Sequence, residues 1–312
     1  MNRWYRLNFI GTLGALAMAC AASFSAAALA QDVDFSGGWS PLYHEDGPER
    51  IPGPDLGDYS GIPINNAARR RGDSYDPERT SIVMEYQCRQ HGGDYSMRGL
   101  ASLRITRDID PATQRVVAFH TRIGFHDMER TIYLDGRPHP PKEAAHTWQG
   151  FSTAEWDGNM LNIKTTHLKE SYLRRNGLPA SDRRTFTEHW TRHGDYLTVV
   201  TVIEDPVFLT ERLVRSQSWS LDPGMAMGFN PCEYVPEVPA PEGTVPHYLP
   251  GKNPFLSEYA ERYGLPLDGV RGGANTMYPE YRLTMGKPAA TPQQCTLFCR
   301  CMNLGGFCPE KP

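Results

Sequence analysis

Apolar and polar side chains alternate through the middle of the chain. From about residue 100 to residue 215, β-branched and aromatic residues alternate with polar ones, as in strands with one buried face. Three turn dipeptides interrupt the pattern, and dipeptides of this kind supply the positive φ of tight hairpin turns. They are Asp135-Gly136, Asp157-Gly158 and Gly194-Asp195. The pattern predicts a meander of about seven or eight antiparallel strands.

Two of the predicted strands separate their faces by residue type. In the run 115–126, Phe119 and Ile123 fall on one face, and His120 and Arg122 fall on the other. In the run 185–193, the even positions carry Phe186, Glu188, Trp190 and Arg192, and the odd positions carry only threonine and histidine. Alternation alone allows the polar faces to line a cavity inside a closed sheet or to meet water outside it.

Proline and glycine break regular structure on both sides of this region. Asn65 or Asn66 can cap a short helix over 67–71, which Gly72 would end. A second helix is predicted from Asn253 to Gly264. Ahead of it, residues 231–254 hold seven prolines, whose missing N–H groups exclude a central strand.

The triplet Gly37-Gly38-Trp39 precedes the strand region. It is similar to the opening of the lipocalins, in which a Trp closes the base of the barrel against an Arg from a late strand. The resemblance implies that Arg212 or Arg215 packs on Trp39. We therefore expect an all-β fold, an antiparallel meander closing into a lipocalin-like barrel, with short helices and a disulfide-stapled C-terminal tail.

The first thirty residues have the parts of a secretory signal. Arg3 and Arg6 precede an apolar stretch over 10–22, and Ala28-Leu29-Ala30 fits the cleavage pattern. An uncleaved anchor and lipid attachment at Cys20 are the alternatives. We divide the chain into a signal peptide (1–30), a barrel-like domain with Pro/Gly-rich decorations (31–290) and a Cys-rich tail (291–312). The mature protein is expected to be periplasmic or secreted, with no transmembrane segment.

Cysteine usage agrees with export. Of the seven cysteines, Cys20 lies in the signal, which leaves an even number for an oxidising compartment. The remaining cysteines are Cys88, Cys232, Cys295, Cys299, Cys301 and Cys308. We expect them to form disulfides whose pairing the sequence does not decide. A zinc knot in the tail, or a Cys88 and His91 ligand pair, is the alternative, but the paired C-x2-C units of common zinc sites are missing.

The net charge and the missing sequence motifs argue against several classes of function. The chain has 32 basic and 36 acidic residues, a net charge of −4, so we expect no nucleic-acid partner. The signal lacks a twin-arginine pair, so export of an unfolded chain without a cofactor is expected. G-x-S-x-G, H-E-x-x-H, Gly-rich phosphate-loop and EF-hand motifs are missing from the sequence.

Histidine density is the chemical signal that remains. Seven of the ten histidines lie between residues 120 and 193. An imidazole on a polar lining can bind a ligand or act as general base, and a nearby guanidinium can hold an anion. The candidate ligand-binding residues are His120, Arg122, Arg130, His146, His167 and His189. For each histidine a structural role is the alternative, and we assign no catalytic residue and no metal site.

Several sequence segments, taken together, are specific enough to indicate a family resemblance. They are RTIYLDGRPHPP (130–141), HTWQGFSTAEWDG (146–158), TTHL (165–168) and EDPVF (204–208). Together they resemble a widespread family of secreted, β-rich bacterial proteins of unknown function, over most of residues 37–285. The resemblance implies secretion and a β-rich fold, but it brings no reaction and no functional residue.

Three functions fit these observations. The first is a periplasmic protein that binds a small, partly apolar or anionic ligand in a barrel cavity. The second is a cofactor-free lyase, isomerase or hydrolase that uses His and Arg in the same cavity. The third is a structural envelope protein whose Pro-rich segments dock a partner. A cavity lined by at least two of the named histidines would favour the first two over the third.

Overall fold

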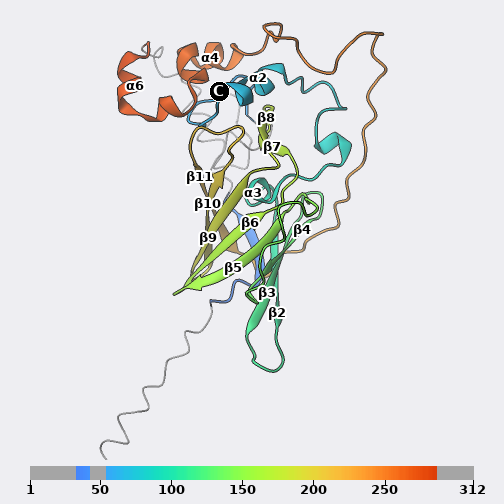
Figure 1. The fold of residues 1–312 in the computed structure, drawn as a ribbon, viewed down its shortest axis with the longest axis vertical. Helices are drawn as coiled ribbons and strands as arrows, with labels where there is room; N and C mark the ends of the chain where they lie inside the picture. Colours follow the sequence, from blue (N-terminus) through green and yellow to red (C-terminus); the bar gives the residue numbers. More distant parts are fainter. Residues whose placement is uncertain (1–32, 43–53, 287–312) are drawn as a thin grey trace, which may run out of the picture. The chain divides into compact units, whose positions relative to one another are not determined.

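The core of the protein is a closed β-barrel, as expected from the predicted meander together with the Gly-x-Trp opening (Figure 1). The structure, a computed structural model, describes residues 33–42 and 54–286. Within these residues, nine strands close in the order β1-β11-β10-β9-β6-β5-β4-β3-β2. Their bounds are β1 Gly37–Pro41, β2 Leu103–Ile109, β3 Val116–Ile123, β4 Met128–Tyr133, β5 Phe151–Asp157, β6 Met160–Thr166, β9 Thr185–His193, β10 Tyr196–Glu204 and β11 Leu213–Leu221. The barrel is consistent with a lipocalin-like fold.

Two of the three predicted hairpin turns are confirmed. Asp157 pairs with Met160, so Gly158 lies in the turn between β5 and β6 with φ +58°. His193 pairs with Tyr196, so Gly194-Asp195 forms the turn between β9 and β10, with Gly194 at φ +59°. In both turns glycine supplies the positive φ that other residues adopt only at a cost.

The third predicted hairpin, at Asp135-Gly136, is wrong. Gly136 has φ +76°, but the chain does not return as an antiparallel strand. Instead β4 pairs with β5 in parallel, with Ile132 opposite Ser152. A parallel pair needs a long connection back to the other end of the sheet, and residues 134–150, the crossover, provide it. A turn dipeptide fixes local dihedral angles but not the strand that follows.

Aromatic side chains close the base of the barrel. Trp39 is fully buried and donates from Nε1 to the carbonyl of Phe35 at 2.9 Å. The ring of Phe35 stacks on Trp156 and meets Trp190 edge-on, with centroids 5.8 and 5.6 Å apart. Packing of this kind adds about 0.5–1.5 kcal/mol per aromatic pair beyond burial.

The arginine that covers Trp39 is Arg192 of β9, with its guanidinium 5.1 Å from the ring centroid. The expectation of Arg212 or Arg215 is therefore wrong. Arg212 pairs with Glu204 at 2.6 Å, and Arg215 donates to the carbonyl of Leu173 at 3.0 Å. Arg192 and Trp39 are brought together by barrel closure, which the order of residues along the chain does not reveal.

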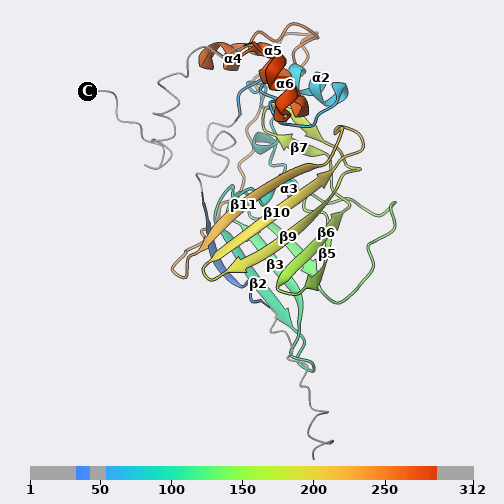
Figure 2. The ribbon, with the colours of Figure 1, turned by 90° about the vertical axis from the view of Figure 1, so that its left-hand side faces the viewer.

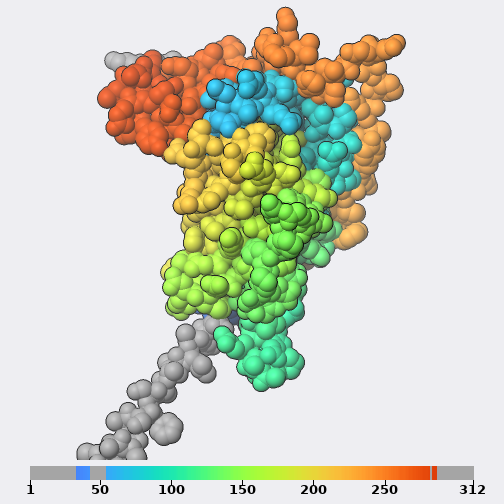
Figure 3. Space-filling view, viewed as in Figure 1, coloured from blue at the N-terminus to red at the C-terminus, as the bar shows by residue number. Residues whose placement is uncertain are grey.

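A cap covers the other end of the barrel, and Figure 3 shows its blue and red segments above the yellow and green strands. It contains the β7–β8 hairpin and several short helices. Their bounds are α2 Asn66–Ser74, β7 Ser171–Arg174, β8 Leu178–Ala180, α4 Glu258–Tyr263, α5 Leu267–Arg271, η3 Gly273–Met277 and α6 Pro279–Thr284. Tyr59 and Ala68 of the cap share a buried cluster with Phe186, Ile203 and Leu213 of the barrel. This cluster attaches the cap to the barrel.

Helix boundaries were predicted less well than strands. Asn65 caps α2 as expected, accepting from the amides of Ala67 and Ala68 at 2.9 and 3.1 Å. Gly72 lies inside the helix, where a Cβ would come within 2.6 Å of the Tyr59 hydroxyl. The second predicted helix begins only at Glu258, because Asn253 instead accepts from the Phe255 amide in a local turn.

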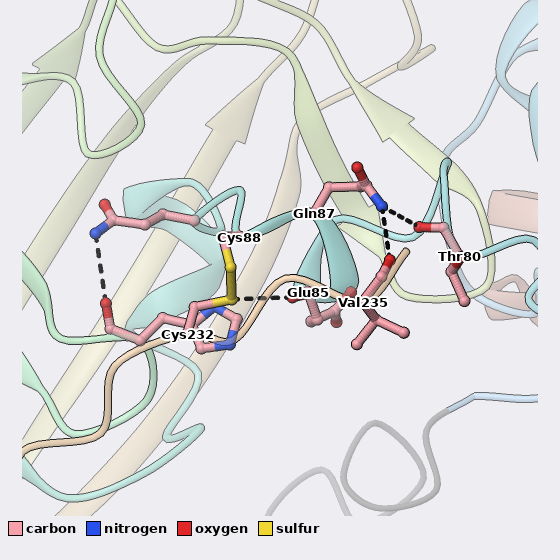
Figure 4. The surroundings of a disulfide bond; sticks show 8 residues. Thr80, Glu85, Gln87, Cys88, Cys232 and Val235 are labelled. Carbon is pink, nitrogen blue, oxygen red and sulfur yellow. Dashed lines mark hydrogen bonds between the residues drawn. A yellow bond between two sulfur atoms is a disulfide. The ribbon is translucent and has the colours of Figure 1, made fainter. Parts of the chain in front are cut away.

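An extended Pro-rich segment, residues 222–250, follows β11 and runs beside the barrel to the cap (Figures 1 and 2). A disulfide between Cys88 and Cys232 ties it to the short helix η2 (Glu85–Gln87), as Figure 4 shows. The Val235 amide also donates to the carbonyl of Tyr86 at 2.9 Å. Cys88 is thus a disulfide cysteine, as preferred over the ligand pair with His91.

Some sequence predictions lie outside the described residues. These are the signal peptide, the Cys-rich tail and the four tail cysteines. The helices described in residues 33–42 and 54–286 are all too short or too polar to cross a membrane.

Candidate functional site

An ion pair lies inside the barrel, between the aromatic base and the cap. Arg130 of β4 and Glu188 of β9 both point inward, with Nη2 2.7 Å from Oε2 and side chains 2% and 0% exposed. Each occupies an inward position of an alternating strand, where a hydrophobic residue is usual. Taking two charges out of water carries a desolvation penalty, so this pair needs an explanation beyond packing.

The surroundings of Glu188 make its carboxyl a weaker acid than an exposed glutamate. Burial raises the pKa of this carboxyl above its usual value, and the charge of Asp94 raises it further. The guanidinium of Arg130 and the indole of Trp190 lower the pKa, but burial outweighs them. Glu188 is therefore a carboxyl that can hold a proton closer to neutral pH than an exposed glutamate.

Several polar atoms around this pair lack a well-directed hydrogen bond. They are both carboxylate oxygens of Glu188, both terminal nitrogens of Arg130 and the Nε1 of Trp190. The ion pair is close, but its geometry does not satisfy these donors and acceptors. Buried polar groups in proteins are nearly always satisfied by protein, water or ligand. Here the guanidinium and the indole face the Glu188 carboxyl at close range, and their remaining hydrogen-bonding capacity is available to a further partner.

A buried plug, residues 91–99, lies directly over this pair and contains the short helix α3, Gly93–Ser96. Asp94 of the plug, 1% exposed, pairs with the fully buried Arg184 at 3.1 Å. Arg184 also donates to the Ser171 hydroxyl at 2.8 Å and the Ser181 carbonyl at 2.7 Å. The plug is therefore held over the barrel mouth by charge as well as by packing.

Two glycines allow the plug to approach this closely. A Cβ on Gly92 would lie 2.2 Å from Nη2 of Arg184. A Cβ on Gly93 would lie 3.2 Å from the Phe186 ring and 3.5 Å from Nη1 of Arg130. The Gly92-Gly93 pair thus brings backbone and the Asp94 carboxylate to within reach of the charges in the barrel.

Arginines also gather at the upper rim of the barrel. Arg98, which follows α3, has a pKa well below its usual value because it is buried and faces the charges of Arg215 and Arg174. Arg174 pairs with Asp58 at 3.1 Å, and both side chains are nearly buried. The barrel mouth is therefore a layer of charged side chains between the aromatic base and the cap.

On the flank of the plug, Glu85 lies between a histidine and an arginine. His91 Nε2 and Arg175 Nε lie 3.2 and 2.9 Å from the same carboxylate oxygen. Burial alone would raise the pKa of Glu85, but His91 and Arg175 together lower it to about 2. His91 packs against Tyr95 with centroids 4.5 Å apart, so this cluster anchors the start of the plug.

Of the six candidate residues from the sequence, only Arg130 lies in the charged layer. His120 and Arg122 are on the outer face of β3, where they pair with Asp108 at 2.8 Å and Asp127 at 2.5 Å. Of the two orientations that the alternation allowed for His120 and Arg122, the structure shows the outward one. Their strand turns its apolar face, with Phe119 and Ile123 buried, toward the interior.

The other three candidates are also on the outer surface. His189 of β9 bonds with the Asn162 side chain at 2.6 Å. His146 lies in the crossover and His167 just after β6, with rings 5.4 Å apart, and they donate to the carbonyls of Leu168 and Pro141. The structure brings these two histidines together but separates them from His120 and His189. Among the described residues, no cluster of three or more His, Cys, Asp or Glu could hold a metal ion.

Glu188, Asp94 and Arg184 were not among the candidate site residues named from the sequence. A signal for Glu188 was present, since it shares the even positions of its strand with Phe186 and Trp190, which had to be buried. A carboxylate on the hydrophobic face of a strand indicates a buried charge. Asp94 and Arg184 lie 90 residues apart, and nothing local pairs them.

Comparison with known proteins gives no further assignment: no protein-family model, no curated protein and no solved structure matches the chain.

Proposed function

We propose that the protein is a periplasmic or secreted binding protein for a small, partly apolar carboxylate, held at the charged layer inside the capped barrel. The observation that carries the proposal is the set of buried polar atoms on Arg130, Glu188 and Trp190 that lack well-directed hydrogen bonds. A ligand carboxylate would accept from Arg130 and Trp190. Its apolar part would contact the rings of Trp190 and Phe186.

Protonation of Glu188 would let Arg130 exchange the Glu188 carboxylate for the carboxylate of a ligand. Its raised pKa means that burial favours the neutral carboxyl. A neutral Glu188 no longer competes for Arg130, and its O–H donates a hydrogen bond to an anion. Ligand binding would therefore be coupled to uptake of one proton, and acid would strengthen it.

Entry to this layer requires the plug to move. Gly93 lies against Phe186 and beside Arg130, and the Asp94–Arg184 pair closes the mouth above them. Displacement of a short segment is a common form of ligand access. The Cys88–Cys232 disulfide supports an oxidising compartment for this binding protein.

The experiment is native mass spectrometry of the full chain, together with thermal shift in butyrate, hexanoate and octanoate at pH 5.5 and 7.5. We expect carboxylates to raise the Tm of the wild type, more strongly at pH 5.5. Arg130→Gln should weaken binding at least about tenfold, and Glu188→Gln should keep binding but lose its pH dependence. Arg137→Gln and Glu155→Gln are matched controls at exposed positions. Equal shifts in Arg130→Gln and wild type, or no shift and no retained mass, would contradict the proposal.

Acid–base catalysis at the same layer is the second candidate. The raised pKa of Glu188 favours it, because a carboxyl that titrates nearer neutral pH can both take and return a proton. Glu188 would then replace histidine in the role of general acid or base. In that case Glu188→Gln should bind ligand but lose turnover by about 10²-fold or more.

A further inference from the structure

A chain of hydrogen bonds links two histidines on the outer face of the β5–β6 hairpin. His139, in the crossover, has Nε2 2.9 Å from the Thr153 hydroxyl and Nδ1 2.8 Å from the Thr166 hydroxyl. The same Thr166 hydroxyl lies 2.7 Å from Nδ1 of His167. The other nitrogen of His167, Nε2, lies 2.9 Å from the carbonyl of Pro141 in the crossover. Both ends of this chain therefore bind the crossover to the barrel.

The carbonyl of Pro141 fixes where the protons lie. A carbonyl only accepts, so His167 carries its proton on Nε2, and its Nδ1 accepts from the Thr166 hydroxyl. That hydroxyl has one proton, so it must accept from His139, which carries its proton on Nδ1. His139 Nε2 then accepts from Thr153. In the neutral state the two histidines are therefore opposite tautomers.

We propose that the His139–Thr166–His167 chain is a proton-sensitive clasp, which fastens the crossover to the β5–β6 face when neutral and releases it when both rings are charged.

Proton balance explains why the second proton is the critical one. A first proton on Nδ1 of His167 is accommodated, because Thr166 turns to donate to His139 and the His139 proton moves to Nε2. With a second proton, both rings direct N–H groups at Thr166. Its own proton then loses its acceptor, and two positive charges face one neutral oxygen. Release of the crossover lets each ring be solvated separately.

The charges around the clasp oppose protonation. The pKa of His139 lies below its usual value because of burial, and then because of the charges of Lys164 on β6 and of His167. The crossover also carries Lys142 and Glu143, which pair at 3.6 Å on the surface. His146 donates from Nδ1 to the Leu168 carbonyl, and β5 turns Glu155 outward at an exposed position. Since the closed state holds protons less readily than the open one, acid favours opening.

The crossover also reaches the plug. At its end, Gln149 donates to the carbonyl of His91 at 2.8 Å and accepts from the Ser96 hydroxyl at 3.1 Å. Opening of the clasp would loosen these bonds, and the consequence, access to the charged layer in acid, rests on the proposed function. The clasp itself does not depend on any ligand.

The first test is the tautomer state of the histidines in the wild-type chain, read by long-range ¹H–¹⁵N NMR near pH 7.5. We expect the Nδ1–H form for His139 and the Nε2–H form for His167. Observation of the Nε2–H form in both would overturn the hydrogen-bond chain on which the clasp depends.

The second test is hydrogen exchange of the Ala144 and Thr147 amides, which bond to the carbonyls of Pro141 and His167. After correction for intrinsic rates, protection should fall about tenfold or more from pH 7 to pH 5, since each histidine contributes up to about tenfold per pH unit. Thr166→Val keeps the β-branched shape without the hydroxyl, and it should be unprotected at both pH values.

His120→Gln is the matched control, because His120 also lies on the outer face but bonds to Asp108 and Thr131. Its exchange should follow the wild type. Protection that is independent of pH, or equal in Thr166→Val and wild type, would overturn the clasp. A clasp that opens while carboxylates fail to bind would instead contradict only the proposed function.

Discussion

The two ends of the barrel interior are built from different chemistry. At the base, Trp39 and Phe35 are fully buried among other aromatic rings. At the mouth, the fully buried side chains include Glu188 and Arg184. The base contains one cation close to a ring, Arg192 over Trp39, whereas the mouth contains paired charges in successive layers. Both ends are built from the same strands: in β9, Glu188 belongs to the mouth and Trp190 to the base.

This difference separates stability from the candidate site. Burial of hydrocarbon stabilises by about 25 cal/mol per Å², so the base contributes directly to folding. Buried ion pairs contribute little net stability, because desolvation offsets their attraction. A hydrophobic replacement of similar volume would serve folding equally well. Under the proposed function, Arg130 and Glu188 serve binding rather than stability.

The largest expected effect comes from breaking the pair on one side. Glu188→Ala leaves Arg130 charged and unpaired in the barrel, and it should lower the free energy of unfolding by about 3–5 kcal/mol. At the base, Leu197→Ala leaves a cavity and should cost about 2–5 kcal/mol. Urea denaturation of both variants measures the two costs. A loss below 1 kcal/mol in Glu188→Ala would show that water already solvates this pair.

Acid should weaken the plug and not the base. The pKa of Glu85 is lowered to about 2, although burial opposes the effect, because His91 and Arg175 stabilise its charge. Its contribution, about 3 kcal/mol, is present above its ordinary pKa and is lost as pH falls from about 4.5 to about 2. The pKa of Glu188 is raised, so its effect is opposite: its contribution to the free energy of unfolding increases as pH falls.

The measurement is the free energy of unfolding of wild type and Glu85→Gln at pH 6 and pH 3. The difference between the two proteins should be large at pH 6 and should shrink at pH 3. A difference that does not change with pH would mean that Glu85 keeps its charge for another reason, or that the cluster is absent.

Adding a Cβ to a glycine should destabilise the protein more at the mouth, where the backbone lies close to side chains, than at the base. Gly92→Ala places a Cβ 2.2 Å from Arg184 and should cost about 1–3 kcal/mol by displacing the plug. Gly158→Ala, in the β5–β6 turn, meets no atom within 4 Å and strains only its positive φ, for about 1–2 kcal/mol. Chemical denaturation gives both values, and exchange of the plug amides should rise in Gly92→Ala alone.

The smallest expected effect is the most informative. The double variant Arg130→Met/Glu188→Leu removes both charges and keeps the volume, so its stability should equal or exceed that of the wild type. Carboxylate binding should be lost completely. A strongly destabilised double variant would show instead that the ion pair itself holds the barrel together, and the contrast between base and mouth would fail.

The candidate site was only partly predictable. Arg130 was named, and the Glu188 position was visible as a carboxylate on an aromatic strand face. The histidines misled, because alternation defines two faces of a strand and does not say which one lies inside. His120 and His189 share their faces with threonine and polar partners, and these faces met water. Asp94 and Arg184 became partners only because Gly92 and Gly93 let the plug descend.

By itself the sequence predicted the meander of strands over residues 100–215, two of its hairpin turns and a disulfide at Cys88. Local alternation and turn chemistry are properties of a few neighbouring residues, so they can be read directly. Tertiary structure alone decided the parallel pairing of β4 and β5, the meeting of Trp39 with Arg192 and the layer of charges beneath the plug. Each of these joins segments distant in the chain, and their contact depends on how the sheet closes and which face it turns inward.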